Sequence, residues 1–242
     1  MQANFKAQGL KKEWAIICVM LICGVKNGDG WNHYSFRGTN WNHRDKDKRY
    51  KGEKFMFNNG LECLRADFHL HTHRDKEFSY TGEENSFVKD YVDALKLAGI
   101  QIGVITNHNK FDKDEYKAIR KAANKEDIFI LPGVELTVKE GANGIHTLIV
   151  FNPDEWLCDG DNHIQTFLTA AFATIPTPES RNTKCTYDLK NTLERLEEYG
   201  RDYFVVFAHV DQNSGLFCEC DGGLLSSFAK RLCLRRSCGV RV

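Results

Sequence analysis

Residues 85–138 read NSFVKDYVDALKLAGIQIGVITNHNKFDKDEYKAIRKAANKEDIFILPGVELTV. Apolar residues recur at helical spacing over 85–99, and a second helical pattern covers 112–126. Each predicted helix is followed by a short apolar run, 100–106 and 128–131, which has the length of a buried strand. Helices that alternate with buried strands are typical of an α/β fold with a largely parallel sheet.

The same alternation extends to both sides of this stretch. Pro132 and Gly133 are predicted to separate the strand at 128–131 from the next one, and the turn sequence KEGANG (139–144) predicts a β-hairpin. Asp112 has a side chain suited to capping the helix that begins there. The remaining predicted strands cover 63–70, 134–138, 145–151 and 203–207, and the remaining predicted helices cover 163–175 and 186–200.

The length of 242 residues fits one large domain, or one domain with extra segments at its ends. Hydrophobic residues make up 42% and charged residues 27%, which excludes collagen-like, coiled-coil and wholly disordered chains. Lysine and arginine together number 33, as do aspartate and glutamate, so the formal net charge is zero. This balance argues against a protein that holds nucleic acid mainly by bulk positive charge.

The nine cysteines have irregular spacing, unlike a secreted disulfide framework, so we expect a reducing, cytoplasmic compartment. An apolar run at 14–25 is too short to span a bilayer, and no membrane association is expected. The run has the length of a signal-peptide core, which leaves secretion as the alternative. We expect an N-terminal extension at 1–60, a folded domain at 61–225 and a basic tail at 226–242.

Histidines gather where the predicted strands end. The carboxyl ends of parallel strands open onto one face of a sheet or barrel, so side chains at these positions are expected to converge. The residues concerned are His69 and His71 after the first strand, His108 after the second, Glu135 after the third, His146 at the start of the second hairpin arm, and His209 after the last strand. Five imidazoles and one carboxylate are therefore predicted to meet in one site.

The H-x-H pair has a stereochemical reason, because residues i and i+2 of a strand point to the same face. His69 and His71 can therefore aim at one ion, and Asp67 shares their face. Imidazole and carboxylate ligands together suit Zn²⁺, Mn²⁺ or Fe²⁺. Glu135 is suited to bridging two ions, a common role for a carboxylate in two-metal hydrolases.

Three other histidines, His33, His43 and His163, are interpreted as surface residues because they lie in loop-like or helical contexts. The role of His73 stays open, since it shares the alternation of the H-x-H pair only if the strand continues that far. Asp161 lies two residues before His163 at the start of a predicted helix, so we interpret it as a helix cap.

Five segments carry a resemblance to a known family. In chain order they are ADFHLHT (66–72), GVITNHN (103–109), LPGVEL (131–136), IHTLIVF (145–151) and FAHVD (207–211). With them the chain resembles the PHP (polymerase and histidinol phosphatase) superfamily over about 61–225. Residues 71–85 and 103–112 are most similar to the PHP domain at the front of large AAA-like ATPase proteins. The resemblance implies a distorted (β/α)₇ TIM-like barrel that hydrolyses phosphomonoesters or nucleic-acid ends.

The resemblance also implies a cluster of two or three divalent ions (Mn, Zn or Fe) at the C-terminal face of the barrel. The ligands that it implies are His69 and His71 for a first ion, His146 and His209 for a second, His108 for a third, Glu135 as a bridge, and Glu77, with Asp75 as the alternative, for a further position. Glu135 and His108 are also the implied catalytic residues.

The chain departs from the family pattern at several places. Asn107 stands where the family usually has an aspartate, and nothing after His209 supplies the closing Asp-x-His ligand pair. A seven-stranded barrel needs about two more strand–helix units. The phosphate-binding motif G-x4-G-K-[S/T] of an ATPase occurs nowhere in the sequence. We therefore expect a barrel that is incomplete at the C-terminus, and an ATPase domain or partner outside this chain.

The leading hypothesis is metal-dependent hydrolysis of phosphoesters, including nucleic acid, provided that the metal site is complete. Arg74 and Lys76 lie beside the predicted ligands and are predicted to hold a phosphate, with ordinary solvated side chains as the alternative interpretation. A second hypothesis is a catalytically incomplete PHP module that binds metal or nucleic acid and regulates an ATPase. A third is an amidohydrolase relative, which typically needs a lysine ligand where this chain has Glu135.

Overall fold

A computed structural model describes residues 26–27, 30–31, 64–179, 183–220, 222–223 and 225–226. The chain divides into two compact units. In the described part of one unit, β1 (Lys26–Asn27) pairs antiparallel with β2 (Gly30–Trp31). The other unit includes residues 65–222 and holds every predicted site residue. The expectations for the apolar run at 14–25, for His33 and His43, and for most of the basic tail lie outside the described residues.

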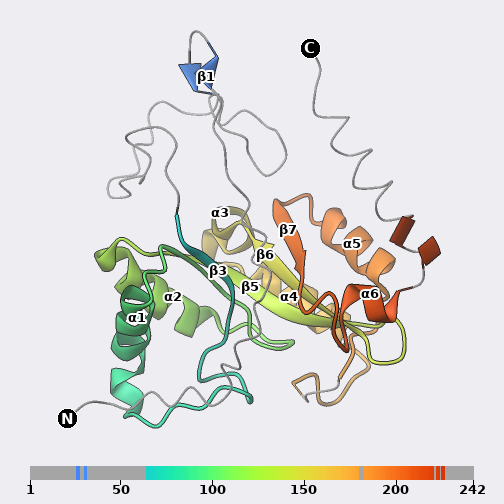
Figure 1. The fold of residues 1–242 in the computed structure, drawn as a ribbon, viewed down its shortest axis with the longest axis horizontal. Helices are drawn as coiled ribbons and strands as arrows, with labels where there is room; N and C mark the ends of the chain where they lie inside the picture. Colours follow the sequence, from blue (N-terminus) through green and yellow to red (C-terminus); the bar gives the residue numbers. More distant parts are fainter. Residues whose placement is uncertain are drawn as a thin grey trace. The chain divides into compact units, whose positions relative to one another are not determined.

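The unit that holds the predicted site is built on a five-stranded sheet in which the strands follow one another in chain order (Figure 1). The first three strands pair in parallel, and the last two pairings are antiparallel. The predicted α/β class is confirmed, with a mixed rather than a largely parallel sheet. The strands are β3 (Ala66–Leu70), β4 (Ile102–Ile105), β5 (Phe129–Val138), β6 (Ile145–Phe151) and β7 (Tyr203–Phe207).

Helices lie beside both edge strands of the sheet. In Figure 1, α1 and α2 lie on the β3 side, and α5 and α6 lie on the β7 side. Among the described residues, no helix has the length and apolar character needed to cross a membrane. The helices are α1 (Phe87–Leu97), α2 (Lys113–Ala123), α3 (Pro153–Trp156), α4 (His163–Ala171), α5 (Leu189–Glu198) and α6 (Leu216–Glu219), with 3₁₀ turns η1 (Glu84–Ser86), η2 (Asn124–Glu126) and η3 (Cys158–Gly160).

Polar side chains at the helix starts decide where two helices begin. The carboxylate of Asp112 accepts hydrogen bonds from the backbone N–H groups of Asp114 and Glu115, so the predicted cap of α2 is confirmed. At α4 the prediction was wrong by one residue: Asn162, not Asp161, accepts the capping bond, from the N–H of Gln165. An asparagine oxygen serves this role as well as a carboxylate does, so the sequence alone does not separate two adjacent candidates.

The strand β5 runs without a break through Pro132 and Gly133, where the sequence pattern predicts two strands. Up to Pro132 the strand pairs in parallel with β4, and from Gly133 onward it pairs antiparallel with β6. Proline has no N–H to donate, and it is tolerated here because the strand changes partner at this point. A Cβ atom on Gly133 would lie 2.8 Å from Cγ1 of Val104 and 3.0 Å from the carbonyl oxygen of Ile149, so glycine allows the close approach of both neighbouring strands.

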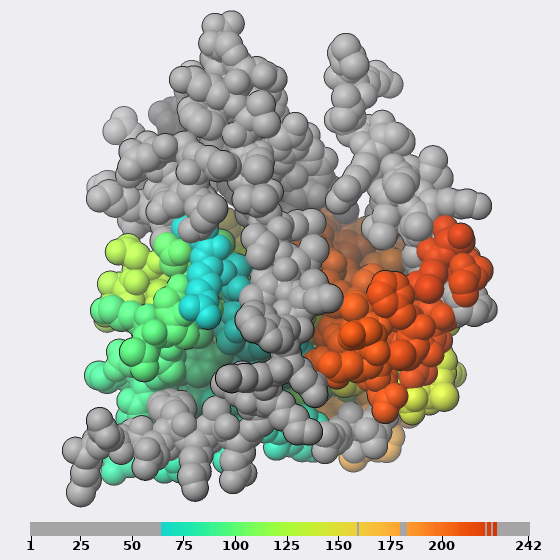
Figure 2. Space-filling view, in the orientation of Figure 1, coloured from blue at the N-terminus to red at the C-terminus, as the bar shows by residue number. Residues whose placement is uncertain are grey.

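The sheet curls so that its two edge strands approach each other. The rings of Phe68 on β3 and Phe204 on β7 have centroids 5.7 Å apart, although three strands lie between them in the sheet. The space-filling view shows the segments around β3 and β7 on the same face of the molecule (Figure 2). β7 runs in the same direction as β5, because each is antiparallel to β6. One end of the half-barrel therefore holds the carboxyl ends of β3, β4 and β7 together with the amino end of β6.

Candidate metal centre

All seven predicted metal ligands line one cleft at this shared end of the sheet. The cleft has a volume of about 430 Å³. Its lining consists of His69, His71, Glu77, His108, Glu135, His146, His209, Asn213 and Ser214. The histidines come from the ends of β3, β4, β6 and β7, as their positions in the sequence predict. Glu135 is expected after the end of its strand, but it lies within β5, because that strand continues to Val138. The role of all seven residues as ligands stays a prediction.

Glu135 lies at the centre of the cleft, on β5 just beyond the point where that strand changes partner. Its side chain is fully buried. One carboxylate oxygen, Oε2, lies 2.6 Å from Nε2 of His69, 3.2 Å from Nε2 of His108 and 3.5 Å from Nε2 of His71. The other oxygen, Oε1, lies 2.7 Å from Nδ1 of His146. One buried carboxylate therefore faces four imidazoles.

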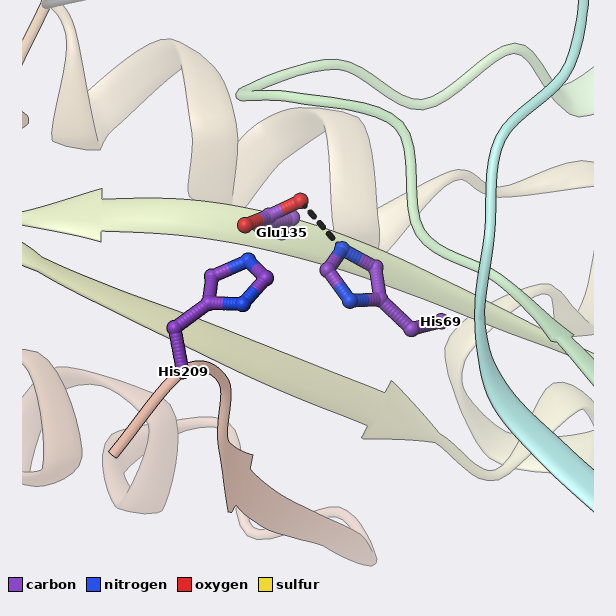
Figure 3. A group of neighbouring side chains, drawn as sticks. All are labelled: His69, Glu135 and His209. Atoms are coloured by element: carbon purple, nitrogen blue, oxygen red, sulfur yellow. Dashed lines mark hydrogen bonds and ion pairs between the residues drawn. The ribbon is translucent and has the colours of Figure 1, made fainter. Parts of the chain in front are cut away.

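The possible ligand atoms form two groups that share Glu135. In the first group, His69 and His209 point toward Glu135 from the two edges of the sheet, as Figure 3 shows. In the second group, His71 and His108 approach the same carboxylate. Within each group the ligand atoms lie within 4.8 Å of one another. The geometry therefore pairs His69 with His209 and His71 with His108, whereas the family resemblance implies His69 with His71 and His146 with His209.

Asp75 holds the second pair of imidazoles from the side away from Glu135. Its Oδ2 accepts hydrogen bonds from Nδ1 of His71 at 3.1 Å, from Nδ1 of His108 at 2.9 Å and from the backbone N–H of His108 at 2.7 Å. The two rings are stacked with centroids 4.7 Å apart. A hydrogen bond at Nδ1 fixes the ring so that Nε2 faces the cleft, as is common for histidines that bind metals. Asp75, the alternative ligand in the sequence analysis, is thus placed to orient ligands.

The electrostatics of the cleft follow from this arrangement. Burial alone would raise the pKa of Glu135, but the imidazoles of His146 and His69 hold it well below its ordinary value. Burial also opposes ionisation of Asp75, and the hydrogen bonds from His108 and His71 outweigh it and lower the pKa. Both carboxylates therefore stay ionised at neutral pH, which gives the cleft two fixed negative charges beside its imidazoles.

The pKa values of His108 and His209 are shifted in opposite directions. Burial would lower the pKa of His108, but the hydrogen bond with Asp75 and the charge of Glu135 raise it above its ordinary value. Burial and the neighbouring imidazole of His69 lower the pKa of His209. Asp75 and Glu135 therefore both favour a proton on His108, whereas at His209 burial and the neighbouring imidazole outweigh the charge of Glu135.

The loop after β7 places His209 by its backbone. His209 has a φ of 49° and Ser214 a φ of 64°. Both values lie in the left-handed backbone region that residues other than glycine rarely adopt. The N–H of His146 donates to the carbonyl of Ser214 at 2.9 Å, which ties this loop to β6. A Cβ atom on Gly215 would collide with the carbonyl oxygen of His209, so glycine is required there. Asn213 and Ser214 are not among the residues that the sequence pattern predicts for the site, although the Ser214-Gly215 pair is a turn signal.

Two buried atoms of this cleft offer lone pairs that a cation could accept. Oε1 of Glu135 and Nδ1 of His146 are buried and lie 2.7 Å apart, but neither has a hydrogen-bond partner of suitable geometry among the described residues. A buried polar atom without a partner costs about 1–3 kcal/mol. A divalent ion that accepted both lone pairs would remove this cost, and the imidazole and carboxylate donors suit Zn²⁺, Mn²⁺ or Fe²⁺.

A second cleft of about 550 Å³ adjoins the first and shares Glu77 and His108 with it. Arg74 and Lys76, the predicted phosphate-binding residues, line it. The Arg74 guanidinium is half-exposed, with Nε 3.7 Å from a carboxylate oxygen of Asp112. Lys110, which no sequence motif predicts, also lines this cleft and donates to Glu179 at 3.2 Å.

Several residues singled out in the sequence lie outside the cleft. The ring of His73 lies between two carboxylates, 2.9 Å from Glu84 and 2.8 Å from Glu115. The carboxylate of Asp67 accepts a hydrogen bond from the N–H of His69 at 3.0 Å, so it supports the strand end and does not line the cleft. His163, at the start of α4, has its Nε2 3.6 Å from Asp161.

No family model matches this chain, and no curated protein matches it either. Among solved structures, the chain is similar to a "putative metal-dependent phosphoesterase" from Bifidobacterium adolescentis, with 12% sequence identity and a TM-score of 0.44. The match covers 70% of this chain and 75% of that chain. A likeness of this size supports no conclusion about activity, so the resemblance to PHP domains and the association with ATPases stay predictions.

Proposed function

We propose that this chain is a metal-dependent phosphoesterase that holds two or more divalent ions, of manganese, zinc or iron, around Glu135. One observation carries the proposal: a buried carboxylate on the central strand is shared by two groups of possible ligands, one of which spans the two edge strands of the sheet. A carboxylate shared by two ions a few ångströms apart is the usual core of two-metal hydrolases of phosphoesters.

The finer proposal is that residues 61–225 form a PHP-type domain whose (β/α)₇ barrel is incomplete at the C-terminus, between an extension at 1–60 and a tail at 226–242. The curled sheet supports it, because its edge strands approach each other as the strands of a barrel do. The placement of the site supports it too, since catalytic groups of such barrels lie at the carboxyl ends of the strands.

The residues of the chain have separate tasks in this proposal. His69, His71, Glu77, His108, Glu135, His146 and His209 would hold the ions, which would lower the pKa of a water molecule and neutralise charge on the phosphoester. Glu135 stays ionised, so it would supply negative charge to ions held on both of its sides and would not donate a proton. His108 opens onto both clefts and is the proposed catalytic imidazole nearest the substrate. Arg74 and Lys76 would bind the phosphate oxygens from the adjoining cleft.

Hydrolysis of an aryl phosphate and of a 5′- or 3′-phosphorylated oligonucleotide tests this function. We expect turnover that needs Mn²⁺, Zn²⁺ or Fe²⁺ and is lost in a His69→Ala/His71→Ala variant. His163→Ala is the matched control, because His163 is half-buried and lies outside the cleft. It is expected to keep the activity of the wild type.

The other hypotheses predict different results in the same assays. Metal binding without turnover of either phosphoester would support the catalytically incomplete module that regulates an ATPase. Hydrolysis of a lactone or an amide without phosphatase activity would support an amidohydrolase relative. Either result would contradict the proposed phosphoesterase.

A further inference from the structure

A buried polar network lies beside the cleft but does not line it. Its members are Thr72, Asn107 and Glu115, with exposed fractions of 0%, 2% and 8%. Thr72 follows His71 in the loop after β3, Asn107 precedes His108 in the loop after β4, and Glu115 lies in the first turn of α2. The network therefore joins the two loops that carry one of the pairs of proposed ligands.

The hydrogen bonds within the network have a defined direction. The side-chain oxygen of Asn107 accepts from the backbone N–H of Thr72 at 2.8 Å, and its Nδ2 donates to the hydroxyl of Thr72 at 2.8 Å. The hydroxyl of Thr72 in turn donates to the carboxylate of Glu115. The backbone N–H of Thr72 thus has one partner in this network and its hydroxyl has two, and the amide of Asn107 supplies both a donor and an acceptor.

The chemistry of Asn107 is matched to this position. The Thr72 hydroxyl donates its single proton to Glu115, so toward its other neighbour its oxygen can only accept a hydrogen bond. The amide NH₂ of asparagine is a donor for this bond, whereas an ionised aspartate offers only acceptors. An asparagine here therefore completes the network, and it avoids placing a further buried carboxylate near Glu115 and Asp75.

The network and Asp75 act on the same two histidines from different sides. Asp75 fixes the rings of His71 and His108 through their Nδ1 atoms. The Thr72–Asn107 pair ties the backbone next to His71 to the side chain of the residue that precedes His108. Fixing both the backbone and the ring determines where each Nε2 lies relative to Glu135.

We propose that Thr72 and Asn107 are positioning residues that set the separation of His71 and His108, and with it the affinity of the His71–His108–Glu135 group for its ion. The proposal rests on the proposed function, because it concerns the same cleft. Neither residue contacts the ion or the substrate; both act through the loops that present the ligands. Outer partners of ligands typically change metal affinity about 10- to 100-fold when they are mutated.

The test compares Thr72→Val, Thr72→Ser and Asn107→Ala with the wild type. Thr72→Val keeps the shape of the side chain but removes the hydroxyl, and Thr72→Ser restores the hydroxyl. Mn²⁺ affinity is measured by titration, and the visible spectrum of the Co²⁺-loaded protein reports on ligand geometry. We expect Thr72→Val and Asn107→Ala to bind Mn²⁺ about tenfold more weakly and to alter the Co²⁺ spectrum, and Thr72→Ser to behave as the wild type.

Thr192→Val is the matched control, because Thr192 on α5 is also fully buried. Its hydroxyl donates to the carbonyl of Asp188, the residue that caps this helix. The variant is expected to lose thermal stability without a change in Mn²⁺ affinity or in the Co²⁺ spectrum. If Thr72→Val fails to fold, Asn107→Ala and Thr72→Ser give the same comparison.

The outcomes separate the two proposals. A wild type that binds Mn²⁺, with unchanged affinity and spectrum in both Thr72→Val and Asn107→Ala, would overturn the positioning role and leave the proposed function intact. Failure of Thr72→Ser to restore the affinity would also overturn it, because the hydroxyl would then not be the cause. A wild type that binds neither Mn²⁺ nor Co²⁺ would overturn the proposed function itself.

Discussion

The two halves of the sheet contribute to the same cleft by different means. The parallel half, β3 to β5, presents His71 and His108 on loops that Asp75 crosslinks through both rings. The antiparallel half, β5 to β7, presents His146 from the start of a strand and His209 from a turn with a left-handed backbone. Glu135 lies on the strand that belongs to both halves. One side of the cleft is therefore oriented by a buried carboxylate and the other by backbone geometry.

This difference has an electrostatic consequence. Asp75 and Glu135 raise the pKa of His108, so the parallel half favours positive charge, whether a proton or a metal ion. Burial and a neighbouring imidazole lower the pKa of His209, so the antiparallel half favours positive charge less. We therefore expect the His71–His108–Glu135 group to hold its ion more tightly than the His69–Glu135–His209 group does.

Removing the charge of Glu135 should affect both halves and have the largest effect. In Glu135→Gln, four imidazoles face a neutral amide, so we expect metal affinity to fall by about 100-fold or more at both groups. Isothermal titration with Mn²⁺ measures the change. Glu198→Gln, an exposed position on α5, serves as the control and should bind as the wild type does. Retention of one tight site in Glu135→Gln would show that the carboxylate is not shared.

Replacing Asp75 should weaken one half only. In Asp75→Asn the rings of His71 and His108 lose a charged acceptor, so we expect the tighter of the two ions to bind about 10- to 100-fold more weakly. His209→Ala should instead weaken the other ion. Competition titrations with a chromophoric chelator resolve the two affinities. Equal losses at both ions in Asp75→Asn would contradict the division into halves.

The low pKa of Asp75 also predicts how the stability of the metal-free protein depends on pH. A carboxylate whose pKa is lower in the folded than in the unfolded state stabilises the fold above the unfolded value, near pH 4, and this contribution is lost as the pH falls further. We expect Asp75 to account for about 2 kcal/mol of the loss in unfolding free energy under acid conditions. Urea unfolding in the presence of a chelator, at pH 6 and pH 3, should show a steeper loss in the wild type than in Asp75→Asn.

A methyl group at the junction of the two halves tests how closely they are packed. In Gly133→Ala, the added Cβ meets Val104 and Ile149, so we expect a loss of about 1–3 kcal/mol in unfolding free energy. Chemical denaturation measures this loss. Gly222→Ala adds a methyl group in open space and should change the stability by less than about 0.5 kcal/mol. Equal stability of both variants would mean that the strand junction is not tightly packed.

The sequence predicts the strands of the antiparallel half and the convergence of the histidines well. The apolar patterns at 145–151 and 203–207 coincide with β6 and β7, because both strands are short, continuous and rich in β-branched or aromatic residues. The convergence follows from strand direction alone, since residues that follow parallel strands must meet at one end.

Other features depend on contacts that no local pattern encodes. The continuity of β5 through Pro132 depends on which strand lies on each side, and the pairing of His71 with His108 depends on how a loop outside the sheet folds around Asp75. Periodicity carries no information about either, because the strand pairing and the bonds between Asp75 and His108 join residues far apart in the chain.

Elemental analysis of the purified protein tests the central claim most directly. The wild type and His163→Ala should contain manganese, zinc or iron in near-stoichiometric amounts, and His69→Ala/His71→Ala should lose most of it. If a well-folded wild type carried no more metal than the double variant, the imidazoles and Glu135 would not form a metal site, and the proposed function would be contradicted.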